Sequence, residues 1–327
     1  MLKMKQFSTP ESKALYQKKM MQKAGSFLVS LYRYVLLISI SYVIIYPMVF
    51  MITTALKTPD AFLDPSIVWI PKVFSLEGFT QAFEALDFSN SFISTLVYEI
   101  VAAVIEIFSC TLAAYGMARF DFKLKGILNV FLMLLIFIPS QMIIIPMTIN
   151  FSDFDILGIV GLIENIIGEP IKINLLNSVW PFYLPSLFGV GLRAGIIIFM
   201  YIQFFKGLPK ELEEAAWIDG AGPFRTFLSI AIPSSGVILF TVSVFSVIWH
   251  WNDYYLAVMY TSSNYPMAVK LNTIEESISV LFRKHAITEK AMIVMAACLI
   301  FILPVLIMYM IVQKKFVQSI DKVGITG

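Results

Sequence analysis

The chain has 327 residues, of which 58% are hydrophobic and only 14% are charged. Soluble globular domains carry about 25% charged residues, so this composition leaves too little polar surface for a water-soluble particle. It indicates a protein with several membrane spans and excludes a disordered chain, a collagen-like fibre and a disulfide scaffold. The formal net charge of +2 provides no basic field for nucleic acid. The two cysteines, Cys110 and Cys298, lie within apolar runs and are expected to be buried free thiols.

Membrane-spanning helices need about 20 mostly apolar residues, and several stretches of the chain meet this requirement. Helices are favoured over strands because each apolar run is continuous and lacks the alternation of a barrel. Between the first two spans, the spacing of the apolar residues predicts a short surface helix over Leu76 to Leu86. A second polar, helix-like run lies near 272–284. Six spans are predicted, at 29–52, 92–118, 127–149, 180–205, 227–249 and 291–312.

The distribution of basic residues predicts the orientation of these spans. The positive-inside rule assigns loops rich in Lys and Arg to the cytoplasm. If the N-terminus is cytoplasmic, the inner segments carry about twice as many Lys and Arg as the outer segments, although the outer segments are longer. We therefore expect both termini in the cytoplasm. The inner segments are then 1–28, 119–126, 205–226 and 313–327.

The inner loop from Gly207 to Pro223 is the one inner segment in which acids outnumber bases. Pro209 suits the first turn of a helix, and the acids that follow it favour a helix N-terminus. Gly220 and Gly222 are expected to end that helix. The pattern predicts a short helix at about 209–218 that could transmit force from a docked soluble partner. An ordinary, well-capped loop is the alternative interpretation.

Residues of this loop resemble the EAA motif of ABC-importer permeases, which reads E-A-A-x₃-G-x₉-I-x-L-P. The matching residues are Glu214-Ala215-Ala216, Gly220, Ile230 and Pro233, and Ile232 stands in place of the motif's leucine. Other segments resemble the carbohydrate, maltose-type branch of that family, and the likeness extends from about residue 30 to the C-terminus. The stretch Glu164 to Leu176 departs from it, being longer and more polar than usual. The resembling segments are Tyr46-Pro47, Leu56-Lys57, Asn90-Ser91, Ala113 to Phe120, Pro139, Ile145-Pro146, Asp219-Gly220-Ala221 and Trp251 to Tyr254.

The resemblance implies an all-α membrane protein with six transmembrane helices, the type I ABC-importer fold and a short cytoplasmic coupling helix. It implies a second, different six-span permease as partner, two ATP-binding subunits that bind ATP and Mg²⁺, and an extracytoplasmic sugar-binding protein. The chain itself would need no cofactor and would not be an enzyme, and its sequence contains no G-x-x-x-x-G-K-[ST] phosphate loop. The implied segments are a cytoplasmic N-terminal segment 1–28, the first span with its outer loop 29–90, the permease core 91–312 with the EAA loop 207–233, and a cytoplasmic tail 313–327.

The resemblance also implies which residues couple the chain to its ATPase. The function it implies is import of a sugar or oligosaccharide across a bacterial-type plasma (inner) membrane. A permease for peptides, amino acids or polyamines remains an alternative, because the EAA loop is shared among importers. A self-contained secondary transporter would show inverted repeats, and a membrane-embedded enzyme would show clustered catalytic residues; neither is evident. The implied coupling residues are Lys210, Glu211, Glu213, Glu214, Ala215, Ala216, Asp219 and Gly220.

Ionisable and aromatic residues at membrane depth are candidates for the substrate path. Ionisable groups in spans usually face the bundle interior or a water-filled cavity. Arg193 could line the path or form an interhelical ion pair with Glu99, and Glu106 lies on the same helical face as Glu99. At the end of the fifth span, aromatic and polar side chains suit a sugar, and an interfacial aromatic belt is the alternative. That last group comprises Trp249, Trp251, Asn252 and Asp253.

The remaining polar and small residues of the spans are given structural interpretations. His250 stands between two tryptophans and is expected to be an interfacial side chain, and no histidine lies at metal-ligand spacing. No metal site and no catalytic residues are therefore expected. Gly191 and Gly195 form a small-x-x-x-small pair, which favours a close helix crossing. Prolines within or beside the spans are expected to kink their helices.

Overall fold

The computed structural model of this chain is helical and confirms the class predicted from the continuous apolar runs. Within the described residues no β-strand occurs. The chain divides into two compact units, Met1–Ser75 and Leu76–Gly327, which we take in turn. The described residues are 10–64, 69–71, 73–155, 158–282 and 287–324.

The first unit is dominated by one long helix, α1 (Pro10–Ala55), which has Pro47 in its interior. A short helix, α2 (Pro59–Leu63), follows and is capped by the Thr58 hydroxyl, which accepts a hydrogen bond from the Ala61 N–H at 3.3 Å. Residues Lys18–Ala55 of α1 are long and apolar enough to cross a bilayer. This helix contains the predicted first span and extends well beyond it at its N-terminal end.

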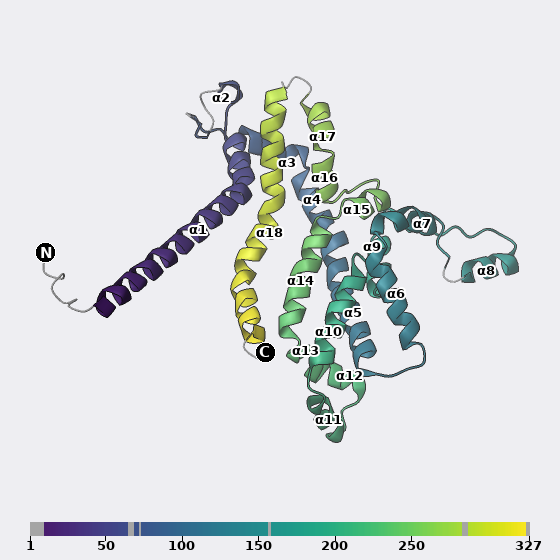
Figure 1. Cartoon of the computed structure of the whole chain (residues 1–327). Coiled ribbons are helices and arrows are strands. Elements are labelled where there is room, and N and C mark those ends of the chain that lie inside the picture. The colour runs from purple at the N-terminus through teal and green to yellow at the C-terminus, as the bar shows by residue number, and fades with distance from the viewer. Residues whose placement is uncertain (1–9, 65–68, 72, 156–157, 283–286, 325–327) are drawn as a thin grey trace. The chain divides into compact units, whose positions relative to one another are not determined.

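The second unit is built around α5, against which α9, α10 and α14 pack (Figure 1). The last helix, α18, packs against α14 and α3. Two short π-helical turns connect helices in this unit: η1 lies between α4 and α5, and η2 lies between α12 and α13. The elements are α3 (Glu77–Ala85), α4 (Phe88–Thr95), η1 (Leu96–Ile100), α5 (Val101–Arg119), α6 (Lys125–Phe137), α7 (Ser140–Ser152), α8 (Ile159–Ile167), α9 (Trp180–Leu187), α10 (Ala194–Gly207), α11 (Glu211–Ile218), α12 (Pro223–Thr226), η2 (Phe227–Ala231), α13 (Ile232–Ser234), α14 (Gly236–Trp251), α15 (Tyr255–Tyr260), α16 (Met267–Asn272), α17 (Ile274–Leu281) and α18 (Ile287–Gly324).

Three segments of the described chain are single helices long and apolar enough to cross a membrane, at Lys18–Ala55, Phe88–Arg119 and Lys290–Gln313. Two further pairs of helices are bent at a short break, and the number is five if each pair is counted as one span. One pair, Lys125–Phe137 and Gln141–Ser152, bends by 106°, and the other, Pro223–Ser234 and Gly236–Trp251, bends by 82°. The stretch predicted as the fourth span consists of two shorter helices, α9 and α10. The total of six spans therefore stays a prediction.

The breaks within these spans have local causes. Pro139 precedes α7 with an extended backbone, and its ring cannot supply the amide hydrogen that would continue α6. Between α9 and α10, Gly189 and Arg193 both adopt left-handed backbone angles, with φ of 68° and 60°, which end one helix before the next begins. The two surface helices expected outside the spans are present as α3 and α17.

The two cysteines are free, as expected from their positions within apolar runs. Cys110 is fully buried in the core beneath α10, whereas Cys298 in α18 is only half-buried.

Candidate functional site

The short helix predicted at about 209–218 is present as α11 (Glu211–Ile218). Its last turn is closed by two backbone hydrogen bonds, from the Gly220 N–H to the Trp217 carbonyl at 3.0 Å and from the Ala221 N–H to the Ala216 carbonyl at 2.9 Å. Gly220 has φ of 82°, a left-handed conformation that favours glycine. The glycine of the EAA-like motif thus ends the helix, as its place in the sequence predicted.

Most side chains of α11 are open to solvent, so the helix presents a mixed apolar and acidic surface. Leu212 is 46% exposed, Trp217 44% and Ile218 87%. Ala216 is half-buried. The remaining predicted coupling residues lie on the surface, with one exception, Glu213. The exposed ones are Lys210, Glu211, Glu214, Ala215, Asp219 and Gly220.

Glu213 is buried and forms an ion pair with Arg119, the last residue of α5. The Arg119 Nε donates to a Glu213 carboxylate oxygen at 2.9 Å, and each side chain is only 3% exposed. A second guanidinium nitrogen, Nη2, donates to the Leu208 carbonyl at 2.7 Å, just before α11 begins. Arg119 therefore holds the coupling helix and the chain that leads into it to the end of α5.

Aromatic side chains support this junction from within the core. Tyr115, one turn before Arg119, packs against Phe205 of α10 and Phe227 of η2, with ring centroids 5.4 Å and 5.2 Å away. Phe205 and Phe227 are both fully buried. The helix α11 is thus attached to a closely packed part of the bundle that includes α5, α10 and η2.

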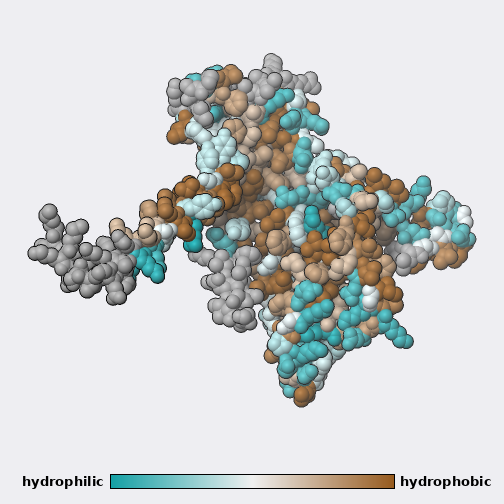
Figure 2. Space-filling model, viewed as in Figure 1, coloured by the Kyte–Doolittle hydropathy of each residue, from teal (hydrophilic) through white to brown (hydrophobic). Residues whose placement is uncertain are grey.

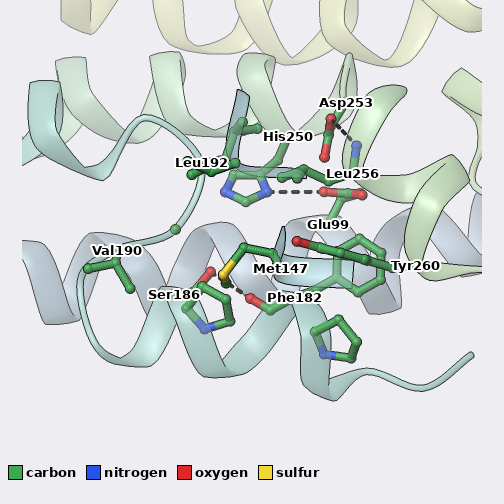
Figure 3. A pocket seen from close by; sticks show the side chains of 14 residues that line it. Glu99, Met147, Phe182, Ser186, Val190, Leu192, His250, Asp253, Leu256 and Tyr260 are labelled. Carbon is green, nitrogen blue, oxygen red and sulfur yellow. Dashed lines mark hydrogen bonds and ion pairs between the residues drawn. The ribbon is translucent and has the colours of Figure 1, made fainter. Parts of the chain in front are cut away.

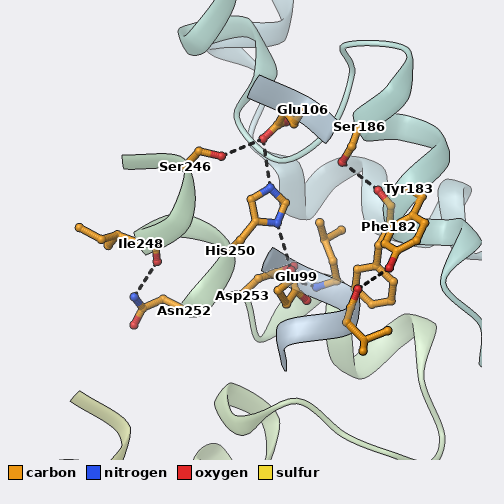
Figure 4. A network of polar contacts seen from close by, with 12 residues as sticks. Glu99, Glu106, Phe182, Tyr183, Ser186, Ser246, Ile248, His250, Asn252 and Asp253 are labelled. Carbon is orange, nitrogen blue, oxygen red and sulfur yellow. Dashed lines mark hydrogen bonds and ion pairs between the residues drawn. The ribbon is translucent and has the colours of Figure 1, made fainter. Parts of the chain in front are cut away.

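A second cluster of polar side chains lies deep in the bundle and is centred on His250 (Figure 4). The imidazole Nδ1 lies 3.1 Å from a Glu99 oxygen, and Nε2 lies 3.0 Å from a Glu106 oxygen. All three side chains are at most 4% exposed. A doubly protonated imidazole can donate to both carboxylates at once, so this arrangement links η1 and α5 to α14.

The interfacial position expected for His250 is therefore wrong. One turn before it, Ser246 is also fully buried, and its hydroxyl donates to Glu106 at 3.4 Å. The α-helical period places Ser246 and His250 on one face of α14, opposite the face of α5 that carries Glu106. Glu99 and Glu106 are seven residues apart, so they lie on one helical face, as the sequence predicted. That face meets the face of α14 that carries Ser246 and His250.

A small cavity adjoins the cluster and is lined by Glu99, His250, Asp253, Ser186 and Tyr260 among others (Figure 3). Its volume of about 50 Å³ is enough for a few water molecules. It is too small for a sugar ring. Within the described chain, one oxygen each of Glu99, Glu106 and Asp253 is buried without a hydrogen-bond partner. The cavity is therefore small and mostly apolar, with unpaired carboxylate oxygens of Glu99 and Asp253 among the residues that line it.

Gly191 allows the loop between α9 and α10 to pass close to this cluster. A Cβ atom at this position would lie 2.6 Å from the Glu106 Oε1 and 2.9 Å from the Ser186 hydroxyl. Gly195, one turn on, would meet α6, with Leu135 Cβ at 3.0 Å and the Ile136 backbone at 3.2 Å. The close crossing predicted from this pair is thus confirmed for Gly195, whereas Gly191 lies against Glu106 of the polar cluster and Ser186 of α9.

The Gly191→Ala substitution is expected to destabilise the protein by about 1–3 kcal/mol, because the added methyl group overlaps the buried Glu106 carboxylate. Thermal unfolding of the purified protein in detergent would measure the effect. Gly126→Ala is the matched control, since no atom lies within 4 Å of a Cβ built there. Equal stability of the two variants would show that the loop can move aside.

The other predicted path residues are spread over different environments. The Glu99 carboxylate forms its ion pair with His250 and not with Arg193. The Arg193 guanidinium instead lies 5.4 Å from the centroid of the Trp249 ring. Trp251 is buried, and its indole N–H donates to the Phe301 carbonyl of α18 at 3.1 Å. Asn252 is exposed and donates to the Ile248 carbonyl at 2.8 Å. Only Glu99, Glu106 and Asp253 of the predicted set gather around the His250 cluster.

Three residues of these sites were missed by sequence reasoning, namely Arg119, Ser246 and His250. A signal existed for Arg119, because it closes the second span next to the loop that carries the acidic helix. For His250 the signal was its place one α-helical turn after a serine in an apolar span, which indicates a buried polar face. Its two tryptophan neighbours suggested an interface instead.

The chain matches a known protein family and is similar to several permease proteins. Residues 110–322 match the family described as binding-protein-dependent transport system inner membrane component. One relative is the melibiose/raffinose/stachyose import permease protein MelC of Bacillus subtilis, 29% identical over 283 residues that cover 86% of this chain and 91% of MelC. Another is the probable starch degradation products transport system permease protein AmyC of Thermoanaerobacterium thermosulfurigenes, 28% identical and covering 77% of this chain and 81% of AmyC.

A solved structure has the same fold. It is a chain of a bacterial ABC transporter involved in the import of the acidic polysaccharide alginate, with a TM-score of 0.68 and 17% identity. The match covers 89% of this chain and 98% of the other. At this level of identity the likeness concerns the fold, and it agrees with the type I importer fold expected above.

Proposed function

Because the chain belongs to the family of binding-protein-dependent transport system inner membrane components, we propose that it is a permease subunit of an ATP-driven importer for a sugar or oligosaccharide. As a member of that family it is an integral inner membrane transport subunit rather than an enzyme. The observation that carries the substrate class is the relatives' function. MelC and AmyC, which align with most of this chain, are named for oligosaccharides and for starch degradation products.

The proposed assembly contains a second, different six-span permease and two ATP-binding subunits that hold ATP and Mg²⁺. An extracytoplasmic sugar-binding protein delivers the substrate. A solved alginate transporter in complex with a pentasaccharide-bound periplasmic protein, similar in fold to this chain, supports this last partner. In this proposal the protein lies in a bacterial-type plasma membrane with both termini in the cytoplasm.

In the proposed mechanism, α11 docks on an ATP-binding subunit through its exposed surface. Movement of α11 reaches the bundle through the Arg119–Glu213 ion pair, since the two side chains join α11 to α5. The α5 helix also carries Glu106, which is held by His250 of α14. The candidate path residues remain Arg193, Glu99, Glu106, Trp249, Trp251, Asn252 and Asp253, of which Glu99, Glu106 and Asp253 lie together beside His250.

The proposal is tested by purifying the tagged chain with the subunits that accompany it and reconstituting the complex in liposomes. We expect uptake of labelled raffinose or maltodextrin that requires both internal ATP and the external binding protein. A panel with a dipeptide, an amino acid and spermidine serves as the comparison. Uptake of one of those compounds in place of the saccharides, or uptake without ATP, would contradict the proposal.

The Gly220→Val substitution is expected to uncouple ATP hydrolysis from uptake. A β-branched residue is strained at φ of 82°, so the end of α11 would be rebuilt while the distant core is untouched. Uptake and ATPase activity of the reconstituted complex are measured together, with Gly222→Ala as the control because Gly222 has a negative φ of −73°. Unchanged uptake in a fully assembled Gly220→Val complex would argue against the coupling role.

A further inference from the structure

The helix α8 (Ile159–Ile167) has an apolar face with no cover from the described part of the chain. Four of its residues recur at the spacing of one helical face, which defines an apolar stripe. Their side chains are 40–83% exposed, so they form a continuous apolar surface on one short helix. Glu164 lies on the opposite, polar face, and Asn165 lies on the flank of that face. The stripe consists of Ile159, Leu162, Ile163 and Ile166.

Polar contacts on the other side hold this helix in place. The Asp155 carboxylate accepts from the N–H groups of Val160 and Gly161 at 2.8 Å and 3.2 Å, which caps the first turn. The Glu164 carboxylate accepts from the Ile171 N–H at 2.7 Å and binds the returning chain to the polar face. The apolar stripe is therefore kept on the outside by the helix's own contacts.

The base of the loop is also closed by hydrogen bonds. The Phe154 N–H donates to the Ile173 carbonyl, and the Leu175 N–H donates to the Phe151 carbonyl, both at 2.8 Å. These bonds bring the chain that leaves α7 beside the chain that leads to α9. The helix thus projects sideways from a fixed base beside α7 and α9, and α4, α16 and α17 lie further from α11 than it does (Figure 1).

The orientation of the stripe points towards the membrane. In Figure 1, α8 lies across the direction in which α5 and α14 run. In Figure 2, the lobe formed by α8 is hydrophilic on its upper side and hydrophobic along its lower edge, the edge on the side of α11. Because α6 and α10 run from about the level of α8 towards α11, the hydrophobic lower edge lies on the side of α8 on which these apolar helices continue (Figure 1).

We propose that α8 is an interfacial helix whose apolar stripe inserts into the lipid leaflet on the side away from α11. The stripe is aliphatic throughout and contains none of the aromatic or arginine residues that are enriched at protein interfaces. The surrounding loop carries more acidic than basic residues, so insertion depends on apolar area and not on anionic lipid. The helix would hold the loop at the membrane surface beside the bundle.

The test measures the surroundings of the stripe in the assembled complex. Single cysteines replace Ile166 on the stripe and Asn165 on the flank of the polar face, in a background where Cys110 and Cys298 are alanine. Each variant is labelled with a fluorescent probe and reconstituted in phosphatidylcholine nanodiscs. Both positions are exposed in the structure, so both should react with the label.

We expect the probe at position 166 to emit at shorter wavelength and to be quenched by lipids brominated in the upper acyl chain. The probe at position 165 should be quenched by iodide in the water instead. Leu162→Cys provides a second stripe position in case the first disturbs assembly. Iodide quenching of both stripe positions, or protection that develops only when the binding protein or another subunit is added, would overturn the proposal.

Discussion

The His250→Ala variant is expected to lose about 3–5 kcal/mol of stability, because it leaves two buried carboxylates without their common partner. Glu99 and Glu106 are at most 1% exposed, so water cannot replace the imidazole without opening the bundle. The loss should appear as a lower midpoint of thermal unfolding and a smaller yield of assembled complex from the membrane.

A matched variant separates the loss of charge compensation from the loss of packing. In the triple variant His250→Leu, Glu99→Gln, Glu106→Gln, no charge remains in the cluster and the apolar side chain fills part of the imidazole volume. Replacement of a buried ion cluster by neutral groups is often close to neutral in stability. We therefore expect the triple variant to unfold at a higher temperature than His250→Ala. If the single variant is as stable as the native protein, the ion pairs do not hold α14 to α5.

The second large effect concerns Arg119. Arg119→Ala removes the ion pair to Glu213 and the hydrogen bond to the Leu208 carbonyl, leaving a buried carboxylate at the start of α11. Because the coupling helix then loses its polar attachment to α5, ATP-driven uptake is expected to fall at least about tenfold, which corresponds to about 1.4 kcal/mol. Uptake and ATPase activity of the reconstituted complex measure this, with the exposed Lys123→Gln as control.

A double-mutant cycle tests whether the two side chains act as a pair. If they do, Glu213→Gln in the Arg119→Ala background adds little to the loss, since the unpaired carboxylate is then removed. Arg119→Lys keeps the charge but cannot reproduce both bonds of the guanidinium fork, so an intermediate loss is expected. Additive losses in the cycle, or full uptake in Arg119→Ala, would contradict a role for the pair in coupling.

Much of the fold could be predicted from the sequence because the bilayer limits the possible structures. Continuous apolar runs have to be helices, and three of the predicted spans are single helices of membrane length, while the third and fifth are bent helix pairs. The fourth run was predicted as one helix, but it consists of α9 and α10. Hydropathy does not report the left-handed backbone at Gly189 and Arg193, which separates the two helices. The short helix predicted at about 209–218 is observed at Glu211–Ile218, because its acids and glycine act locally, although Pro209 lies before its first turn.

The contacts between helices could not be predicted in the same way. Whether Glu99 pairs with Arg193 or with His250 depends on how α14 is rotated against α5, and no local pattern reports that rotation. The same holds for Glu213, which local reasoning grouped with the exposed acids of its helix. Its burial depends on Arg119, which lies 94 residues earlier in the chain.

The amino-acid sequence by itself determined that this chain is a helical membrane protein with one short acidic loop helix, because composition, hydropathy and capping act over a few residues at a time. Only the tertiary structure decided which polar groups face one another. Charges buried in a bilayer need partners within about 3 Å, and those partners come from helices far apart in the sequence. The packing of α5 against α14 and of α11 against the end of α5 therefore decided that Arg119 pairs with Glu213 and that His250 pairs with Glu99 and Glu106.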